Sequence, residues 1–419
     1  MKPASFALAA AAIVLAAASA VAQTAPVVIK ASTVIDGKGG TLSNVAIVVQ
    51  GSKILRIEPA GANATYDLTA QTVMPGWIDT HAHIVDHFNR SNGRLHTAAD
   101  PETLEQTTLY AYENAYKTFM AGFTTLQSPG NPVDKDIRDW INDGRVAGPR
   151  ILTSIHQLFD NSGTPEQIRS LVDQWVKEGA DFVKVFASGS IREGGLKTMS
   201  DAQIEAACGE AKKLGKRSIV HAQGPDSAKS AILAGCTSIE HGNRLSDEDI
   251  TLMVQHGTYF DSNNHLMIHN YLDNKAHFIG IGNYTESGYG YMERGLVSGN
   301  DSFKRALAAK VKMVFGTDAT AGAHGRNAEE LIYRVKDGGQ APMDAIVTAT
   351  LRSAQSLGLD KQIGVIAPGM EADIIATDGN PLQDITSVRR VTFVMRGGKV
   401  FKNEAPGSGS RAASTRRTN

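Results

Sequence analysis

The sequence predicts an α/β protein whose larger part is a (β/α)₈ TIM barrel, joined to a small composite β-sandwich domain built from both chain ends. In the middle of the chain, β-branched runs alternate with amphipathic, helix-length segments such as 164–180 and 201–215, as parallel strands with helical crossovers require. Short strands split by Gly, Asp and Asn turns also occur near both termini. The eight central runs are TVMPGWID, FTTLQS, RILTSI, FVKVFAS, RSIVHA, TSIEHG, TYFDSN and KMVFGTD.

Length and charge agree with such an architecture. A chain of 419 residues is long enough for one large barrel with an accessory domain. Its formal net charge of -1 gives no reason to expect nucleic acid or an acidic membrane surface as a partner. A doubly wound open sheet is the alternative architecture, but the chain lacks a glycine-rich loop of the required spacing.

The chain begins with a segment of different composition. Lys2 precedes an apolar run over 5–22 that ends in Ala-Val-Ala. One positive charge, a short apolar core and small residues at the end are typical of a secretory signal peptide. We therefore expect residues 1–22 to be removed and the protein to be exported, periplasmic or secreted, without stable membrane association. An uncleaved membrane anchor is the alternative.

The domain boundaries follow from these patterns. Residues 23–75 and 367–403 are expected to form the two parts of the β-sandwich, and 76–366 the barrel. The tail 404–419 lacks an apolar pattern and is expected to be disordered. The two cysteines, Cys208 and Cys236, are too few for a disulfide scaffold; we expect small buried residues, and the sequence leaves a single disulfide between them open.

Polar side chains occupy the strand runs in an unusual way. Active sites of barrels lie at the carboxyl ends of the strands, so side chains far apart in the chain meet at one mouth. Each residue taken singly also has an ordinary explanation as a buried or capping side chain, but a convergent set of imidazoles and a carboxylate indicates a metal site. The set comprises His81, His83, Lys184, His221, His241 and Asp318.

These motifs carry a resemblance to a known family. The order DTHAH, VKVFAS, IVHAQG, SIEHG and VFGTDA, followed by GVIAPGMEADIIATDGNPL, resembles the amidohydrolase superfamily over residues 27–403. The match is most similar to its prolidase-like branch, which hydrolyses amide bonds to C-terminal amino acids, and to bacterial amidohydrolases that degrade ochratoxin A. The resemblance implies the barrel with a two-ended β-sandwich expected above.

The resemblance also implies roles for the polar set. His81, His83 and Asp318 would hold the more buried of two divalent metal ions, most simply Zn²⁺, and His221 and His241 the second. Lys184 would carry a CO₂-derived carbamate that bridges both ions. A hydroxide bridging the two ions would attack the scissile carbonyl, with Asp318 as the catalytic acid–base.

The residues that bind substrate are less evident, because the glycine–histidine loop and the tyrosine usual in the prolidase-like branch are replaced here. Candidates on the same rim are loop cations and polar groups that could hold a carboxylate or an oxyanion. The long segment 265–295, rich in apolar and aromatic residues, is expected to be a flap over the site or a subunit contact. The candidates are Arg192, His265, His324, Gln223 and His156, with Arg192 and His265 preferred.

The expected activity is hydrolysis of an amide bond to a C-terminal amino acid, in an N-acyl amino acid, a dipeptide or an ochratoxin A-like substrate with an apolar or aromatic side chain. A lactone, ester or cyclic-amide hydrolase similar to imidazolonepropionase is the alternative on the same scaffold. A non-catalytic binding protein would be expected to lack some of the six ligands. The resemblance further implies a homo-oligomer, such as an octamer.

Overall fold

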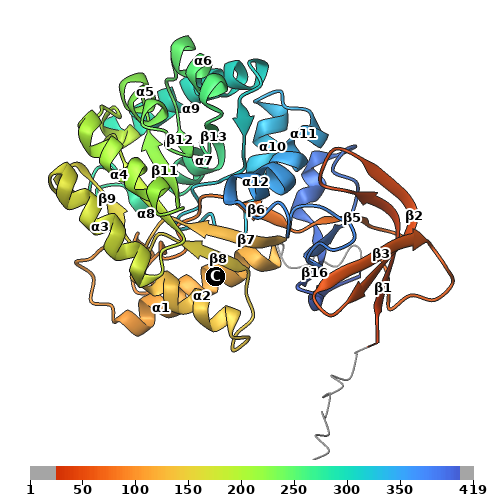
Figure 1. The fold of residues 1–419 in the computed structure, drawn as a ribbon. Helices are drawn as coiled ribbons and strands as arrows, with labels where there is room; N and C mark the ends of the chain where they lie inside the picture. The colour runs from red at the N-terminus through yellow and green to blue at the C-terminus, as the bar shows by residue number, and fades with distance from the viewer. Residues whose placement is uncertain (1–24, 406–419) are drawn as a thin grey trace, which may run out of the picture.

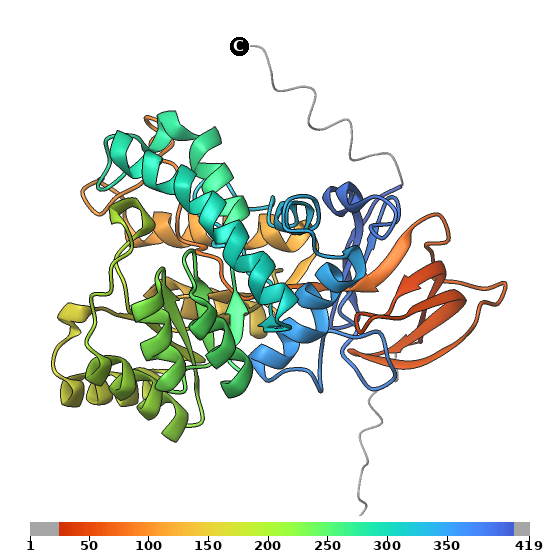
Figure 2. The same ribbon diagram turned by 90° about the horizontal axis from the view of Figure 1, so that it is seen from above.

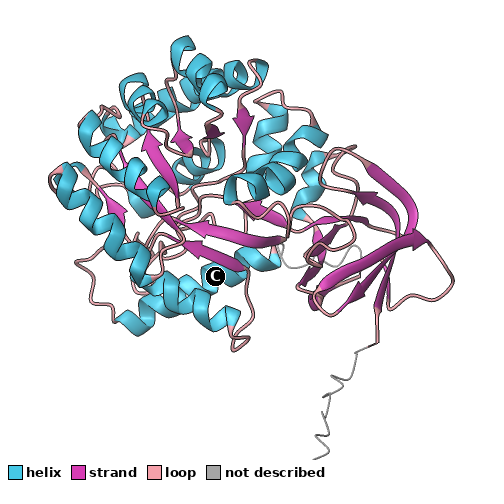
Figure 3. Cartoon of the chain, in the orientation of Figure 1, coloured by secondary structure: helices cyan, strands magenta, loops and turns pink. Residues whose placement is uncertain are grey.

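The computed structural model describes residues 25–405, with helices arranged around central parallel strands and a β-rich lobe to one side (Figures 1 and 3). The predicted signal segment 1–22 and most of the predicted tail 404–419 lie outside the described residues. The central strands are β6 (Trp77–Asp79), β7 (Phe123–Ser128), β8 (Arg150–Thr153), β9 (Gln157–Leu158), β10 (Phe182–Phe186), β11 (Arg217–Ala222), β12 (Ser238–His241), β13 (Tyr259–Asp261) and β14 (Lys312–Met313).

These strands form two parallel ladders, β6-β7-β8 and β9 to β14, in which each strand pairs with its neighbour in the chain. A parallel bridge between Ala82 and Ala319 joins the segments that follow the first and last of them. Sequential parallel pairing with helical crossovers is the organisation of a (β/α) barrel. The structure is therefore a barrel with an extra domain.

Helices follow most of the barrel strands and cover their outer side (Figure 3). Five of them begin at a Ser, Thr or Asn whose side chain accepts a hydrogen bond from the first turn in a capping box. The helices are α1 (Leu104–Met120), α2 (Pro132–Asn142), α3 (Pro165–Glu178), α4 (Asp201–Lys213), α5 (Pro225–Leu233), α6 (Asp247–His256), α7 (His265–Asp273), α8 (Lys275–Phe278), α9 (Glu286–Ala308), α10 (Glu329–Lys336), α11 (Pro342–Val347) and α12 (Ser353–Leu357).

The extra domain is a single eight-stranded sheet that contains both ends of the described chain (Figure 2). The order β17-β16-β15-β5-β1-β2-β3, with β4 beside β1, places β5 between an N-terminal and a C-terminal strand. As expected, strands from both chain ends make up this domain. Hydrogen bonds join all eight of these strands into one sheet. The strands are β1 (Val27–Ile35), β2 (Thr41–Gln50), β3 (Lys53–Pro59), β4 (Tyr66–Asp67), β5 (Thr72–Pro75), β15 (Ile374–Thr377), β16 (Val391–Arg396) and β17 (Lys399–Asn403).

The first predicted strand run, 72–79, divides into two strands that belong to different sheets. Gly76 lies between β5 and β6, and a Cβ placed there would come within 2.1 Å of the Thr124 hydroxyl oxygen. Only glycine fits so close to β7. The chain therefore passes directly from the extra domain into the barrel strand that leads to His81 and His83.

A disulfide joins Cys208 of α4 to Cys236, the residue pair for which the sequence favoured unpaired burial. Both cysteines are buried and lie within the apolar layer between the barrel strands and helices α3 to α6. The bond ties α4 to the segment that leads into β12. Among residues 25–405, no helix is both long and apolar enough to cross a membrane.

Candidate active site and metal centre

All six predicted metal ligands line one cavity of about 380 Å³ at the carboxyl ends of the barrel strands. His81 and His83 follow β6, and Lys184 lies within β10. His221 and His241 lie at the ends of β11 and β12, and Asp318 follows β14. Residues separated by up to 237 positions (318 − 81) thus share one site because parallel strands bring their carboxyl ends together.

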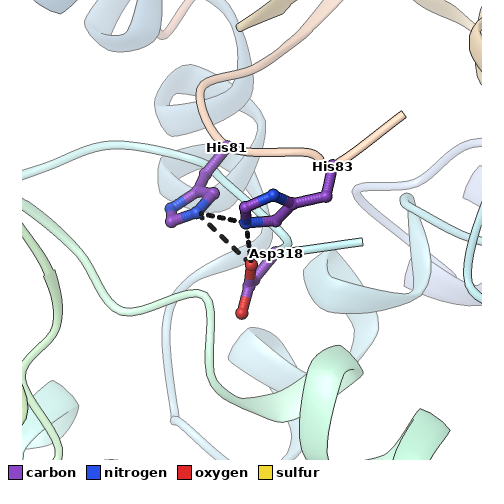
Figure 4. A group of neighbouring side chains, drawn as sticks. All are labelled: His81, His83 and Asp318. Carbon is purple, nitrogen blue, oxygen red and sulfur yellow. Dashed lines mark hydrogen bonds and ion pairs between the residues drawn. The ribbon is translucent and has the colours of Figure 1, made fainter. Parts of the chain in front are cut away.

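The most compact part of the site is formed by His81, His83 and Asp318 (Figure 4). The Nε2 atoms of the two histidines lie 3.3 Å apart, and Oδ1 of Asp318 lies 3.3 Å from the first and 3.1 Å from the second. Ligands of a tetrahedral zinc ion, with bonds of about 2.0–2.1 Å, lie roughly 3.3 Å from one another. The three atoms therefore fit one divalent ion.

The other three side chains adjoin this group. Nζ of Lys184 lies 3.4 Å from Nε2 of His81, and the ring of His241 lies 5.5 Å from the ring of His81, centroid to centroid. His221 lies 4.4 Å from His241 by the same measure. Nδ1 of His241 is buried and has no hydrogen-bond partner within the described part of the chain, as expected of a nitrogen that serves as a metal ligand.

Two of the predicted ligands have a backbone conformation that non-glycine residues rarely adopt. His241 has a φ of 70° and Asp318 a φ of 50°. Such left-handed conformations at side-chain-bearing residues carry a free-energy cost and concentrate at functional sites. His241 is the last residue of β12, whereas Asp318 lies in the segment that follows β14.

Burial controls the protonation of the site. It lowers the pKa of His221 to about 3 and the pKa values of His81 and His241 well below the usual range, so these rings are neutral and can act as ligands. Burial also lowers the pKa of Lys184. Burial opposes ionisation of Asp318, yet the hydrogen bond from His83 and the charges of His83 and Lys184 lower the pKa of its carboxyl group.

The predicted substrate residues divide into two groups, of which only Arg192 and Gln223 line the cavity. The Arg192 guanidinium lies over the ring of Tyr284 at 4.1 Å and near that of Tyr271 at 5.4 Å, and its Nε donates a hydrogen bond to Asn283 at 2.6 Å. Two aromatic faces and an amide thus hold the only arginine that lines the cavity within residues 25–405.

His265, His324 and His156 lie outside the cavity lining. His265 begins α7 and is buried, with its ring nitrogens 3.3 Å from Glu330 and 3.2 Å from Asn300. His324 contacts the carbonyl oxygen of Asp86, and His156 contacts Glu178 on the outer side. The expected pairing of Arg192 with His265 is therefore absent from this cavity.

Other residues of the cavity wall did not emerge from the sequence motifs. Tyr271 and Tyr284 come from the segment 265–295, so part of this segment does cover the site. Phe159 stacks on Phe186 at 4.7 Å, and Phe186 lies 5.0 Å from the ring of His221. Asp86, three residues after His83, also lines the cavity; its place in the HAHIVD motif was the available signal.

A second group of metal-ligand types, His87, His96 and Glu102, lies outside this cavity. The rings of the two histidines stack at 4.6 Å with only 16° between their planes. A metal ion lies in the plane of each imidazole that binds it, and nearly parallel stacked rings have no such common position. This group is a packing cluster in the segment between β6 and α1.

Known proteins are similar to this chain over most of its length. The model of the Amidohydrolase family matches residues 72–401. The chain is 27% identical to the ochratoxinase of Aspergillus niger over 440 aligned residues, which cover 91% of this chain and 87% of that protein.

Solved structures are similar over most of the chain. A Xaa-Pro dipeptidase with bound methionine superposes with a TM-score of 0.81 at 29% identity, over 90% of this chain and 100% of that one. The crystal structure of the A. niger ochratoxinase, at 23% identity, shares the fold with a TM-score of 0.78 over 91% and 96% of the two chains. Because the family model matches most of this chain, the chain belongs to the amidohydrolase family and is a hydrolase of amide-type carbon–nitrogen bonds.

Proposed function

We propose that the protein is a binuclear metal-dependent amidohydrolase that releases a C-terminal amino acid from an N-acyl amino acid, a dipeptide or an ochratoxin A-like amide. One observation carries this proposal. A single cavity contains six ligand-type side chains and, on its wall, the guanidinium of Arg192. The relatives named as ochratoxinase and Xaa-Pro dipeptidase support the same substrate class.

His81, His83 and Asp318 would hold one divalent ion, most simply zinc, and His221 and His241 a second. The buried, neutral-leaning amine of Lys184 is suited to take up CO₂, and the resulting carbamate would contribute anionic oxygens to both ions. When bound, two such ions supply an activated water and polarise the scissile carbonyl.

The chain's own residues would then divide the remaining work. Asp318 is ionised at neutral pH, so its carboxylate can accept a proton from the attacking water and pass it to the leaving amine. Within the described residues no carboxylate forms an ion pair with Arg192, which leaves its charge available to the α-carboxylate of the substrate.

The aromatic wall accounts for the proposed preference for apolar or aromatic groups. Phe159 lines the cavity and stacks on Phe186, and 39% of this residue is exposed. Met267 and Tyr271 add apolar surface beside Arg192. Such walls favour a substrate in which an aromatic group lies next to the amide bond.

We also propose that the protein is exported and forms a homo-oligomer. The disulfide between Cys208 and Cys236 supports an oxidising compartment. Large exposed apolar side chains, among them Leu104, Leu109 and Trp140, offer surface for a subunit contact. Intact-mass analysis of the protein from its native host tests export, and sedimentation tests assembly; an unprocessed N-terminus or a monomer would contradict these two proposals.

The activity test is release of free amino acids, followed by mass spectrometry, from N-acyl amino acids, dipeptides and ochratoxin A. The protein is loaded with zinc in bicarbonate, and a chelator-treated sample and His221→Asn serve as controls. Amino-acid release that the chelator abolishes supports the proposal. Hydrolysis of lactones or cyclic amides alone would instead favour the imidazolonepropionase-like alternative, to which the 24% identity with that enzyme of Geobacillus kaustophilus points.

A further inference from the structure

Glu240 is a buried carboxylate that contacts a predicted metal ligand from the side opposite the cavity. It precedes His241 on β12, yet its Oε2 lies 2.8 Å from Nδ1 of His81, which follows β6. Neighbouring residues of a regular strand point to opposite faces. His241 has a φ of 70°, which departs from a regular strand, and both His241 and Glu240 lie close to the ring of His81.

The carboxylate of Glu240 is held in place by donors. The Ser238 hydroxyl donates to Oε1 at 2.5 Å, and the Asn263 amide donates to Oε2 at 3.0 Å. Glu240 and His81 are 1% and 0% exposed, so water does not compete for these hydrogen bonds. The position of the carboxylate relative to the imidazole is therefore fixed by the fold.

This contact determines which ring nitrogen of His81 can bind a metal. Nδ2 of Asn263 lies 3.0 Å from both Nδ1 of His81 and Oε2 of Glu240, and an amide nitrogen only donates, so its hydrogen bond goes to Oε2. Nδ1 of His81 lies 2.8 Å from the same oxygen and donates to it. Nε2 then presents its lone pair toward Nε2 of His83 and Oδ1 of Asp318, each 3.3 Å away. The ring is set in the tautomer and orientation that a ligand needs before any ion arrives.

We propose that Glu240 is the positioning residue of the more buried metal ion, acting through His81 to set the affinity of that half of the site. This inference rests on the proposed metal-dependent function. A carboxylate behind a ligand imidazole fixes its tautomer and raises its basicity, and loss of such a partner weakens metal binding by roughly 10- to 100-fold.

The test is the zinc affinity of Glu240→Gln, which keeps the size of the side chain and one acceptor oxygen but removes its charge. Metal-free protein is titrated with zinc against a competing chromophoric chelator, and thermal unfolding of the metal-free forms checks that the fold is retained. One of the two zinc-binding steps, that of the site containing His81, is expected to weaken by roughly 10- to 100-fold. Glu210→Gln, a buried glutamate on α4 that pairs with Lys213 outside the site, should leave both affinities unchanged.

Equal zinc affinity in Glu240→Gln and the unaltered protein would overturn the role of Glu240 alone, whereas an unaltered protein that binds no zinc would overturn the metal-dependent function as well. A second measurement uses the unaltered protein and therefore does not require that the variant folds. Anomalous diffraction at the zinc edge from crystals of the unaltered protein is expected to place the ion at Nε2 of His81. An ion at Nδ1 would contradict the inference.

Discussion

Nε2 of His83 lies 3.1 Å from Oδ1 of Asp318, although 235 positions (318 − 83) separate the two residues in the chain. The first follows β6 and the second β14, the first and last strands of the barrel. The bridge between Ala82 and Ala319 holds these two segments side by side. The contact between His83 and Asp318 therefore depends on the whole barrel. A substitution of either residue tests the site and not a local turn.

Asp318→Asn should retain part of the metal and lose most turnover. The amide keeps the size of the side chain but cannot take a proton from water, and a lost acid–base group reduces rates by roughly 10²–10⁴-fold. Steady-state kinetics with metal content measured in parallel checks this. Asp143→Asn, at an exposed residue after α2, is the matched control. Near-normal turnover of D318N would remove Asp318 from the mechanism.

Lys184→Ala should lose the binuclear metal content, because the proposed carbamate supplies oxygen ligands to both ions. Added short-chain carboxylic acids should restore part of the metal and of the activity by occupying the space that the lysine leaves. Elemental analysis and turnover with and without the acid measure this. Lys213→Ala, on the surface of α4, should behave as the unaltered protein does. Full metal occupancy in K184A would show that the lysine has a structural role only.

Arg192→Gln should raise KM for N-acyl amino acids by roughly 10- to 100-fold, the range expected for a lost hydrogen bond to a charged group. Substrates whose carboxylate is converted to an amide should be hydrolysed by both proteins with similar KM. Arg145→Gln, at an exposed arginine, provides the control. An equal KM increase for both substrate types would mean that Arg192 supports the loop between β10 and α4 and does not read the carboxylate.

His221→Asn should make the metal-free protein less sensitive to acid. Unfolded His221 binds a proton near pH 6.5, whereas burial lowers its folded pKa to about 3, so between these values the unfolded state holds more protons and stability falls as pH falls. Between pH 8 and pH 5, the free energy of unfolding should therefore fall by about 2 kcal/mol less in the variant than in the unaltered protein. Burial raises the pKa of Asp79 and of Asp261 to about 7, so these two carboxyl groups make the folded state more stable as pH falls. Because both proteins contain them, the difference between the variant and the unaltered protein isolates the effect of His221.

Urea unfolding of the unaltered protein and the variant at pH 8, 6.5 and 5 measures this difference. His256→Asn changes an exposed histidine on α6 and should follow the unaltered protein at every pH. If the free energy of unfolding had the same pH dependence in H221N and in the unaltered protein, His221 would be protonated in the folded state.

The sequence predicted the barrel and its polar mouth because both depend on short-range patterns. Alternation along a strand places His81 and His83 together, and the strand-end position of Asp318 is visible in a single motif. The structure brings these residues into one cavity with Lys184, His221 and His241, as expected. Their role as metal ligands stays a prediction that the experiments above address.

The substrate wall was harder to predict, because its contacts join loops whose paths the local sequence does not determine. Arg192 is held by Tyr271 and Tyr284, which come from the segment after β13. His265 was expected beside it, yet the start of α7 turns its ring toward Glu330. The pairing of Cys208 with Cys236 likewise required the relative position of α4 and β12.

The place of β5 between β1 and β15 also bears on the order in which a growing chain can fold. During synthesis, β5 leaves the ribosome about 300 residues before its partner Ile374–Thr377, so one of its edges stays open until the barrel sequence has been made. An open apolar edge invites pairing with other chains. We therefore expect that a nascent chain stalled before β15 needs a chaperone, and that truncation at the C-terminus causes aggregation rather than a smaller working enzyme.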